Sequence, residues 1–150
     1  MNNTKLKGDI AEQAIVLSSL KNGWEVLRPI GDRMPYDLVL DVNSVLVKIQ
    51  VKAAWYDSSR DNYVVDNRRT KTNRKQMLRS RYTTDDFDFA IIYIDELQVC
   101  YIMPVDIFID YGSEIHLVEA TKRQRKPRSF EFREAWHLIS NWAASEEIPK

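Results

Sequence analysis

This sequence lacks several features, and each absence narrows what the protein can be. Its 150 residues include one cysteine, Cys100, so the chain cannot form an internal disulfide, which favours a reducing compartment. Because Cys100 lies in the apolar run QVCYIM, we expect a buried structural thiol rather than a nucleophile. No apolar run approaches the roughly 20 residues of a membrane span, and the polar start MNNTKLKGD does not resemble a signal peptide. We therefore expect a cytoplasmic protein without a membrane partner.

Glycine is also scarce, and the chain contains no Gly/Ser linker, internal repeat or low-complexity tract. Boundaries between domains usually fall in such linkers, so nothing divides residues 1–150. A chain of this length suffices for one domain with a hydrophobic core. We expect a single domain.

Net charge is absent too, because 22 cationic residues balance 22 carboxylates, but the charges are segregated. Residues 67–84 and 121–130 contain 12 of the cations and no acid, which leaves 10 cations against all 22 carboxylates elsewhere. One such run is often only a solvated loop. Two runs in a small chain favour a polyanionic partner such as nucleic acid.

Apolar spacing predicts a helix near each end of the chain. Residues 5–22 form the first, which Asn22-Gly23 would end, and its apolar residues lie on more than one side. One side would pack on a sheet and the other on something else. Residues 130–144 form the second, because their apolar positions follow i, i+3, i+4, i+7. Its tryptophans, Trp136 and Trp142, suit either an interface with a second copy or a cover for the core.

Between these helices the apolar pattern predicts strands, separated by turns such as Asn43-Ser44 and Asp95-Glu96. A helix, a run of strands and a final helix indicate an α/β (α+β) class, with a central mixed β-sheet flanked by helices. The predicted strands are residues 24–28, 36–42, 45–54, 88–94, 98–104 and 115–120.

The strand predicted at 45–54 carries polar residues suited to chemistry. Alternation places Gln50 and Lys52 on one face, about 6.6 Å apart at a rise of roughly 3.3 Å per residue. A hairpin through Asn43-Ser44 would bring Asp37, at the start of the preceding strand, beside the end where Gln50 and Lys52 lie. Three polar groups would then meet at one end of a sheet.

Hydrolysis of a phosphodiester needs such a set of groups. A carboxylate holds Mg²⁺, which prefers oxygen ligands, and the ion stabilises charge on the phosphate and acidifies a water. A lysine orients or helps to deprotonate that water. Gln50 offers only a neutral oxygen where a carboxylate is usual, and the carbonyl of Val51 is a further donor. Glu12, on the first predicted helix, would restore negative charge, although the helix dipole also favours a glutamate there.

Four segments carry a further signal: KLKGDIAEQA, GDRMPYDLVLD, KIQVKAAW, and DDFDFAIIYI followed by VCYIMP. In this order they resemble the PD-(D/E)XK nuclease superfamily over roughly residues 5–106. More narrowly, they resemble its small intron-encoded homing-endonuclease branch in bacteria, which includes cyanobacterial enzymes that act at tRNA genes. The resemblance implies an αβββαβ core and Mg²⁺-dependent double-strand cleavage of DNA.

Matched residue by residue, the resemblance makes Glu12 the helix carboxylate and Asp37 the metal-binding aspartate. Gln50 becomes the second ligand position and Lys52 the catalytic lysine. Mg²⁺, for which Mn²⁺ can substitute, would be held by Asp37, Val51 and Glu12. Because Gln50 replaces an acid that some branches of the superfamily also lack, the metal affinity and the number of ions stay open.

The basic region at about 60–82 is expected to read DNA, for example as a β-ribbon. Arginine suits guanine, and asparagine or glutamine suits adenine, in the major groove. The second basic run would hold backbone phosphates or a minor groove. The residues predicted to contact DNA are Arg68, Arg69, Lys71, Asn73, Arg74, Lys75, Gln76, Lys122, Arg123, Arg125 and Lys126.

Cutting both strands of a long target requires two active sites, so we expect a homodimer or homotetramer on double-stranded DNA. Other nuclease chemistries are disfavoured, because His116 and His137 do not form an HNH-type site and no LAGLIDADG or GIY-YIG pattern occurs.

The leading hypothesis is a sequence-specific, Mg²⁺-dependent DNA endonuclease of intron homing. A Holliday-junction resolvase shares the core but recognises shape, and amide side chains interleaved with arginines favour base readout. A catalytically inactive DNA-binding protein would explain Gln50, but the retained carboxylates and lysine oppose it. An RNA-binding domain lacks a recognisable module.

Overall fold

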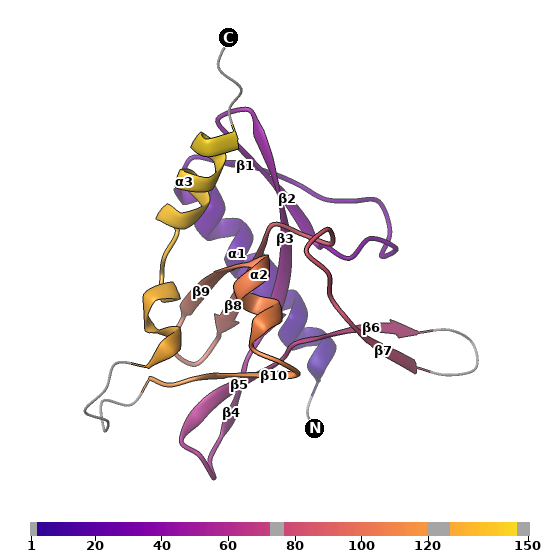
Figure 1. Ribbon diagram of the computed structural model, residues 1–150, viewed down its shortest axis with the longest axis vertical. Coiled ribbons are helices and arrows are strands. Elements are labelled where there is room, and N and C mark those ends of the chain that lie inside the picture. The colour runs from indigo at the N-terminus through magenta and orange to yellow at the C-terminus, as the bar shows by residue number, and fades with distance from the viewer. Residues whose placement is uncertain (1–2, 73–76, 120–126, 147–150) are drawn as a thin grey trace.

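A five-stranded mixed sheet lies at the centre of the protein (Figure 1). The computed structural model describes residues 3–72, 77–119 and 127–146. The strands of the sheet are β1 (Glu25–Leu27), β2 (Leu38–Val42), β3 (Val45–Ala53), β8 (Phe89–Ile94) and β9 (Val99–Pro104). Their order is β1-β2-β3-β8-β9, and only the pair β3 and β8 is parallel among these five. This sheet, with helices on its faces, confirms the predicted class.

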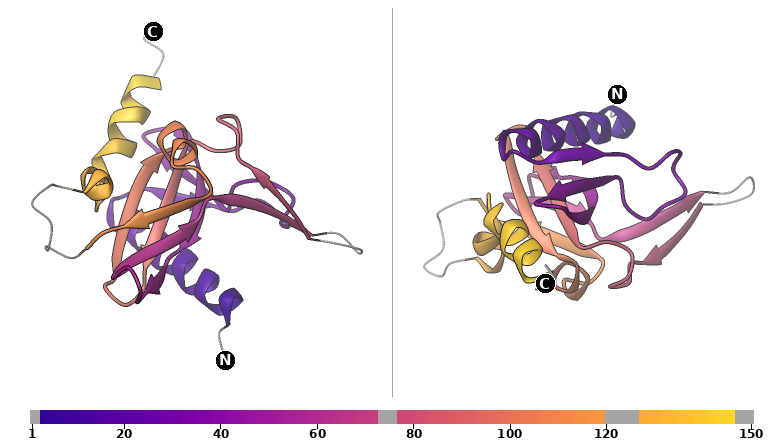
Figure 2. Two further views of the ribbon diagram at one scale, coloured as in Figure 1. Left: turned by 60° about the horizontal axis from the view of Figure 1, so that its bottom comes forward. Right: turned by 90° about the horizontal axis from the view of Figure 1, so that it is seen from above.

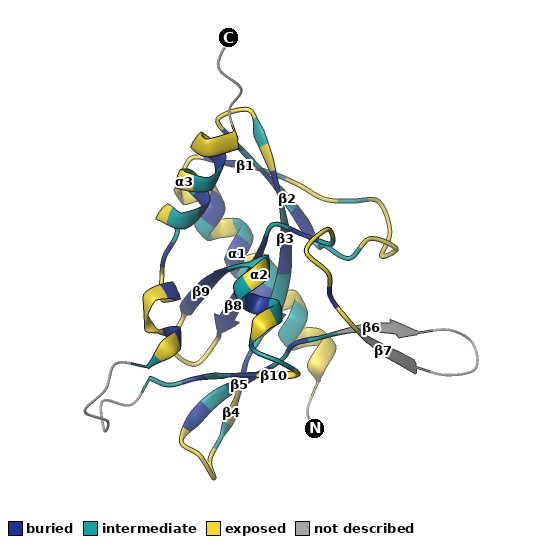
Figure 3. Ribbon diagram, viewed as in Figure 1, coloured by how far each residue is buried: buried dark blue, intermediate teal, exposed yellow. Residues whose placement is uncertain are grey.

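The sequence of each strand matches its depth in the fold. β8 reads FAIIYI, and all six of its residues are buried, as the dark blue ribbon in Figure 3 shows. A strand covered on both faces requires such a continuous apolar run. β2 alternates instead, because Leu38, Leu40 and Val42 are buried while Val39 and Asp41 are half-buried. One face of β2 therefore packs on the core.

Helix α1 (Thr4–Lys21) lies across one face of the sheet (Figure 2). Its N-cap Asn3 accepts a hydrogen bond from the backbone N–H of Leu6 at 2.9 Å, and Gly23, in the left-handed region at φ 87°, follows its end. Ala11 and Ile15 are fully buried in the core cluster beneath it. Among the described residues, neither α1 nor any other helix is long and apolar enough to cross a membrane.

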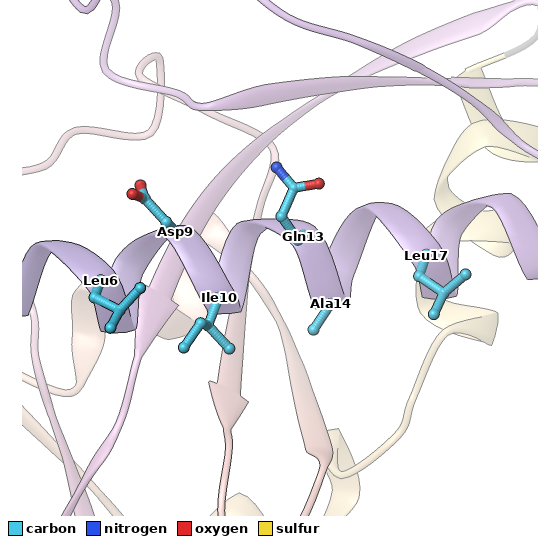
Figure 4. Close-up of a pocket in the computed structure, with 6 residues that line it drawn as sticks. All are labelled: Leu6, Asp9, Ile10, Gln13, Ala14 and Leu17. Carbon is cyan, nitrogen blue, oxygen red and sulfur yellow. The ribbon is translucent and has the colours of Figure 1, made fainter.

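The outer side of α1 is apolar as well, as the sequence predicted. The side chains of Leu6, Ile10 and Leu17 are exposed by 53%, 37% and 54%. Together with Ala14 they point to one side of the helix, while Asp9 and Gln13 point to the other (Figure 4). The sheet thus covers one of the two apolar sides of this helix.

The connection between β3 and β8 contains strands where the expected αβββαβ order has a helix. Two of these strands join a three-stranded sheet of order β10-β5-β4, and two pair with each other as a ribbon. Segments such as NYVVD are rich in β-branched and aromatic residues, which favour extended backbone. The bounds are β4 (Trp55–Asp57), β5 (Asn62–Asp66), β6 (Arg68–Thr72), β7 (Met77–Arg81), α2 (Val105–Asp110) and β10 (Glu114–Leu117).

The C-terminal helix is shorter than predicted. In place of a helix over 130–144, a 3-10 helix η1 (Arg128–Phe132) precedes α3 (His137–Glu146). Between them Glu134 has a φ of 51°. Its backbone N–H donates to the carbonyl oxygen of Cys100 at 2.7 Å, and its carboxylate accepts the N–H of Cys100 at 2.8 Å. The break covers the edge of β9, an interaction that helical periodicity does not encode.

The tryptophans of the C-terminal segment pack inward. The ring of Trp136 lies 6.2 Å from that of Trp24, and the ring of Trp142 lies 6.0 Å from Phe89 in an edge-on contact. These contacts support the reading of a helix that covers the core. The core cluster also contains Cys100, which is 3% exposed. Burial raises the pKa of its thiol to about 12, so the expected structural thiol is confirmed.

Candidate active site

Asp37 immediately precedes β2, and two hydrogen bonds fix it to β3. Its backbone N–H donates to the carbonyl oxygen of Ile49 at 2.8 Å, and its Oδ2 accepts the N–H of Val51 at 2.8 Å. The turn Asn43-Ser44, with both residues in the left-handed region, sets the register of β2 on β3. The hairpin therefore brings Asp37 to the far end of β3, as the sequence predicted.

The surroundings of Asp37 oppose its charge. Burial raises the pKa of the carboxyl above 3.8, although the hydrogen bond from Val51 lowers it. The charge of Glu12 raises this pKa further, and that of Lys52 lowers it. A partly buried carboxylate next to a second carboxylate attracts a cation.

Gln50 meets Asp37 at the main chain of Val51. It is 9% exposed, and its Nε2 donates to the carbonyl oxygen of Val51 at 3.2 Å. Asp37 binds the N–H of Val51, whereas Gln50 binds its carbonyl. Both polar side chains thus support one residue of β3.

Lys52 reaches the base of the ribbon formed by β6 and β7. Its Nζ donates to the carbonyl oxygen of Arg68 at 3.2 Å and lies 5.1 Å from the ring centroid of Tyr82. Arg68 begins β6, and Tyr82 directly follows β7. Burial lowers the pKa of Lys52 below 10.5, while the charges of Asp66 and Asp37 raise it. The amine is therefore held between the site and the ribbon.

Glu12 projects from α1 and forms an ion pair with Arg28, whose Nε lies 2.9 Å from Oε1. Its charge still contributes to the raised pKa of Asp37. The structure thus brings Asp37, Gln50 and Lys52 together at one end of β3. Glu12 lies close by, engaged by a cation that the sequence did not connect with it.

A comparison with protein families matches residues 2–139 to a family described as PD-(D/E)XK endonuclease. The chain belongs to the PD-(D/E)XK endonuclease family. Among solved structures it is similar to that of a bacterial homing endonuclease, I-Ssp6803I, with 59% sequence identity and a TM-score of 0.91. This similarity covers 99% of this chain and 100% of that chain. No curated protein matches the sequence. The enzyme class and the family expected from the sequence are confirmed.

PD-(D/E)XK nucleases use divalent metal ions, and the donors around Val51 suit one. The carboxylate of Asp37, the carbonyl of Val51 and the amide oxygen of Gln50 are hard oxygen donors. Within residues 3–72, 77–119 and 127–146, no three His, Cys, Asp or Glu side chains gather as a metal site. Main-chain and amide oxygens, together with water and phosphate, suit a hard cation that keeps several waters.

The sequence did not predict that Asp66 and Tyr82 would lie beside Lys52. Asp66 Oδ1 accepts the backbone N–H of Arg68 at 2.9 Å and its Nε at 3.1 Å. The Asp-x-Arg spacing is a local turn signal, but nothing in it indicates that the turn would face Lys52. Tyr82 lies in the basic run and carries no signal of its own.

The basic region predicted to read DNA contains the β6/β7 ribbon, which projects from the body in Figures 1 and 2. Arg68 and Arg81 pair at its base, and the guanidinium of Arg68 is engaged by Asp66. Arg69 and Lys71 lie in β6. The other predicted contacts lie outside the described residues: Asn73, Arg74, Lys75, Gln76, Lys122, Arg123, Arg125 and Lys126.

Proposed function

We propose that this endonuclease is a Mg²⁺-dependent homing enzyme that makes double-strand breaks at a long DNA target. The contact of Lys52 with both roots of the ribbon, at Arg68 and Tyr82, carries the proposal. A duplex bound along a basic ribbon would lie beside Asp37 and Lys52. The full-length similarity to a bacterial homing endonuclease supports the same function.

In the proposed reaction Asp37 and the carbonyl of Val51 would hold the metal, Mg²⁺ or Mn²⁺, and Glu12 would add negative charge. A bound divalent ion supplies charge stabilisation to the phosphate and acidifies a water. Lys52 orients that water and donates to the phosphate, and its lowered pKa makes it a better proton carrier than a free lysine. Gln50 holds the carbonyl of Val51 in place through its amide.

Double-stranded DNA is the partner that this activity requires. We assign base and phosphate contacts to the predicted ribbon residues, including Arg68, Arg69 and Lys71, and phosphate contacts to the run at 122–126. The chain would act as one nuclease domain over residues 1–150 and as a homodimer or homotetramer. We place it in the bacterial cytoplasm on chromosomal DNA, with a target in a tRNA gene.

Cleavage of a random-site duplex library with Mg²⁺ tests this function. Wild type should cut a restricted set of sites, and Lys52→Ala should bind the same sites but cut them roughly 10²- to 10⁴-fold more slowly. Lys21→Ala, at the end of α1, is the matched control and should cut like wild type.

Other outcomes of the same assay would replace the proposal. Binding without any cutting, in Mg²⁺ or Mn²⁺, would identify an inactive DNA-binding protein. Preference for four-way junctions over every linear duplex would identify a resolvase.

A further inference from the structure

The loop between β1 and β2, residues 28–36, carries apolar side chains that the site described above does not use. Ile30 is 92% exposed and Met34 is 48% exposed. Gly31 follows Ile30 in the left-handed region at φ 83°, so the chain turns sharply there. Single exposed apolar residues are common on protein surfaces. Ile30 and Met34 matter here because their loop is attached to residues of the proposed active site.

Both ends of the loop are fastened to carboxylates of the site. At its start Arg28 is paired with Glu12 at 2.9 Å. At its end comes Asp37, which is bonded to β3 through its backbone and its side chain. Tyr36 packs against the core, and Nζ of Lys48 lies 5.7 Å from the centroid of its ring. The loop is therefore an extension of the site, anchored at both ends and exposed between them.

The loop and the ribbon project from the same side of the molecule. Figure 1 and both views of Figure 2 show the violet β1–β2 loop and the ribbon on the same side of the body. The loop leads into Asp37, and the ribbon begins at Arg68, which Lys52 contacts. A duplex with one phosphate at Asp37 and Lys52 and a groove against the ribbon would meet this loop next.

The chemistry of the loop suits DNA. Arg33 is exposed and, among the described residues, forms no ion pair, so its guanidinium can bind a phosphate. Branched apolar side chains contact thymine methyl groups in the major groove or wedge between base steps in the minor groove. Both kinds of contact bury surface that is exposed in the free protein.

We propose that the β1–β2 loop is a second DNA-contacting element, separate from the ribbon. It places Ile30 against base edges next to the cleaved phosphate and Arg33 against the backbone. The inference rests on the proposed function, because it requires a duplex bound at Asp37 and Lys52. In this proposal the loop determines one part of the sequence preference, namely the preference for the base pairs at the cut.

Protection of a thiol tests the contact directly. Because Cys100 is buried, the variant Ile30→Cys has one accessible thiol. Leu46→Cys is the matched control, since Leu46 is 59% exposed at the opposite end of β3. Both are made with Lys52→Ala, so that a duplex recovered from the library stays uncut. The rate of alkylation by a maleimide is measured with and without that duplex.

With the duplex at about 90% saturation, alkylation at position 30 should slow about tenfold by mass action, while position 46 reacts at its free rate. Fluorescence anisotropy shows whether the duplex is bound in the sample. If it is bound and position 30 is alkylated equally fast with and without it, the loop assignment is overturned and the proposed function stands. Absence of binding to any duplex would overturn the proposed function, and the loop assignment with it.

Sequence preference provides a second measurement. Selection from the library with Ile30→Ser should lose between about fivefold and a hundredfold of discrimination at base pairs beside the cut. Preferences farther from the cut should persist, and Leu46→Ser should select as wild type does. An unchanged preference beside the cut would overturn the proposed role of Ile30.

Discussion

At the scale of single residues, the site holds two charges in places where burial disfavours both. Burial raises the pKa of Asp37 and lowers that of Lys52, so it shifts each group toward its neutral form. Each also partly compensates the other, because their opposite charges shift both pKa values back. A fold that tolerates this arrangement loses stability at the two residues that we propose for its chemistry.

We expect Asp37→Asn to abolish cleavage and to stabilise the fold at neutral pH. The pKa of Asp37 is higher in the folded state than the unfolded value of 3.8, so the native protein holds this proton more tightly. The resulting stability is full below pH 3.8 and is lost as pH rises through the raised pKa. Asparagine keeps an oxygen for the N–H of Val51 without the charge. Its gain should be about 0.5–2 kcal/mol in the free energy of unfolding near neutral pH.

Urea unfolding at a series of pH values measures this difference. The gain should grow from acidic to neutral pH, as the raised pKa of Asp37 requires. A variant no more stable than wild type at neutral pH would show that burial of Asp37 carries no net cost.

We expect Gln50→Glu to keep metal binding and some cleavage. The amide of Gln50 donates to the carbonyl of Val51, and a carboxylate cannot. Without metal, this lost bond and the added charge beside Asp37 should destabilise the variant by about 1–3 kcal/mol. Mg²⁺ should therefore raise its melting temperature more than that of wild type, and Gln50→Ala serves as the uncharged control. Complete loss of metal binding and cleavage would show that Gln50 is not a tolerant ligand position.

At the scale of elements, the ribbon is fastened to the body on both of its strands. Asn67, before β6, is 4% exposed and donates from Nδ2 to the carbonyl oxygens of Phe108 and Gly112. Arg81, at the end of β7, donates from Nη2 to the carbonyl of Ile109 at 3.1 Å. Both strands are thus anchored around α2, next to the amine of Lys52. The ribbon that we propose to recognise DNA and the lysine that we propose to act in cleavage therefore share one base.

Replacing cations of the ribbon should weaken DNA binding and make the affinity less dependent on salt concentration. Each lost phosphate contact lowers the slope of log affinity against log salt by about 1. The double variant Arg69→Gln and Lys71→Gln should therefore lower the slope by about 2 and leave the cleavage rate of bound DNA nearly unchanged. Fluorescence anisotropy at several salt concentrations measures the slope, with Lys21→Gln as control. An unchanged slope would exclude the ribbon from phosphate contact.

The sequence revealed those parts of the site that depend on local pattern. Alternation along β3 and the Asn43-Ser44 turn were enough to bring Asp37, Gln50 and Lys52 together, because a hairpin relates nearby residues by register. The pairing of Glu12 with Arg28 was not predictable. It depends on how α1 packs on the sheet, and no periodicity encodes that.

The same limit explains the errors in the fold. Helical spacing predicted one helix across 130–144, but Glu134 gains more by closing the edge of β9 than by continuing a helix. The β-ribbon suggested for the basic region is present as β6 and β7, which pair with each other. The strand β5 was not predicted, because its partner β10 is distant in sequence. Propensity is a weak prior against such tertiary contacts.

At the scale of the whole molecule, the described residues present one site of this kind, whereas a double-strand break requires two cuts. Trp136, which precedes α3, and Trp142, which lies in α3, pack on rings within the same chain, so self-association has no need of these rings. We keep the proposal that two copies act together, each cutting one strand. This arrangement makes a definite prediction for mixed assemblies.

Co-expression of wild type with Lys52→Ala should produce an enzyme that nicks. If copies pair at random as dimers, about half of them contain one intact site, and those cut a single strand. A supercoiled plasmid with one target should then accumulate as open circles, whereas wild type mixed with Leu46→Ser should yield linear DNA. Linear product without excess open circles would mean that one copy cuts both strands, and a single active site would have to serve each strand in turn.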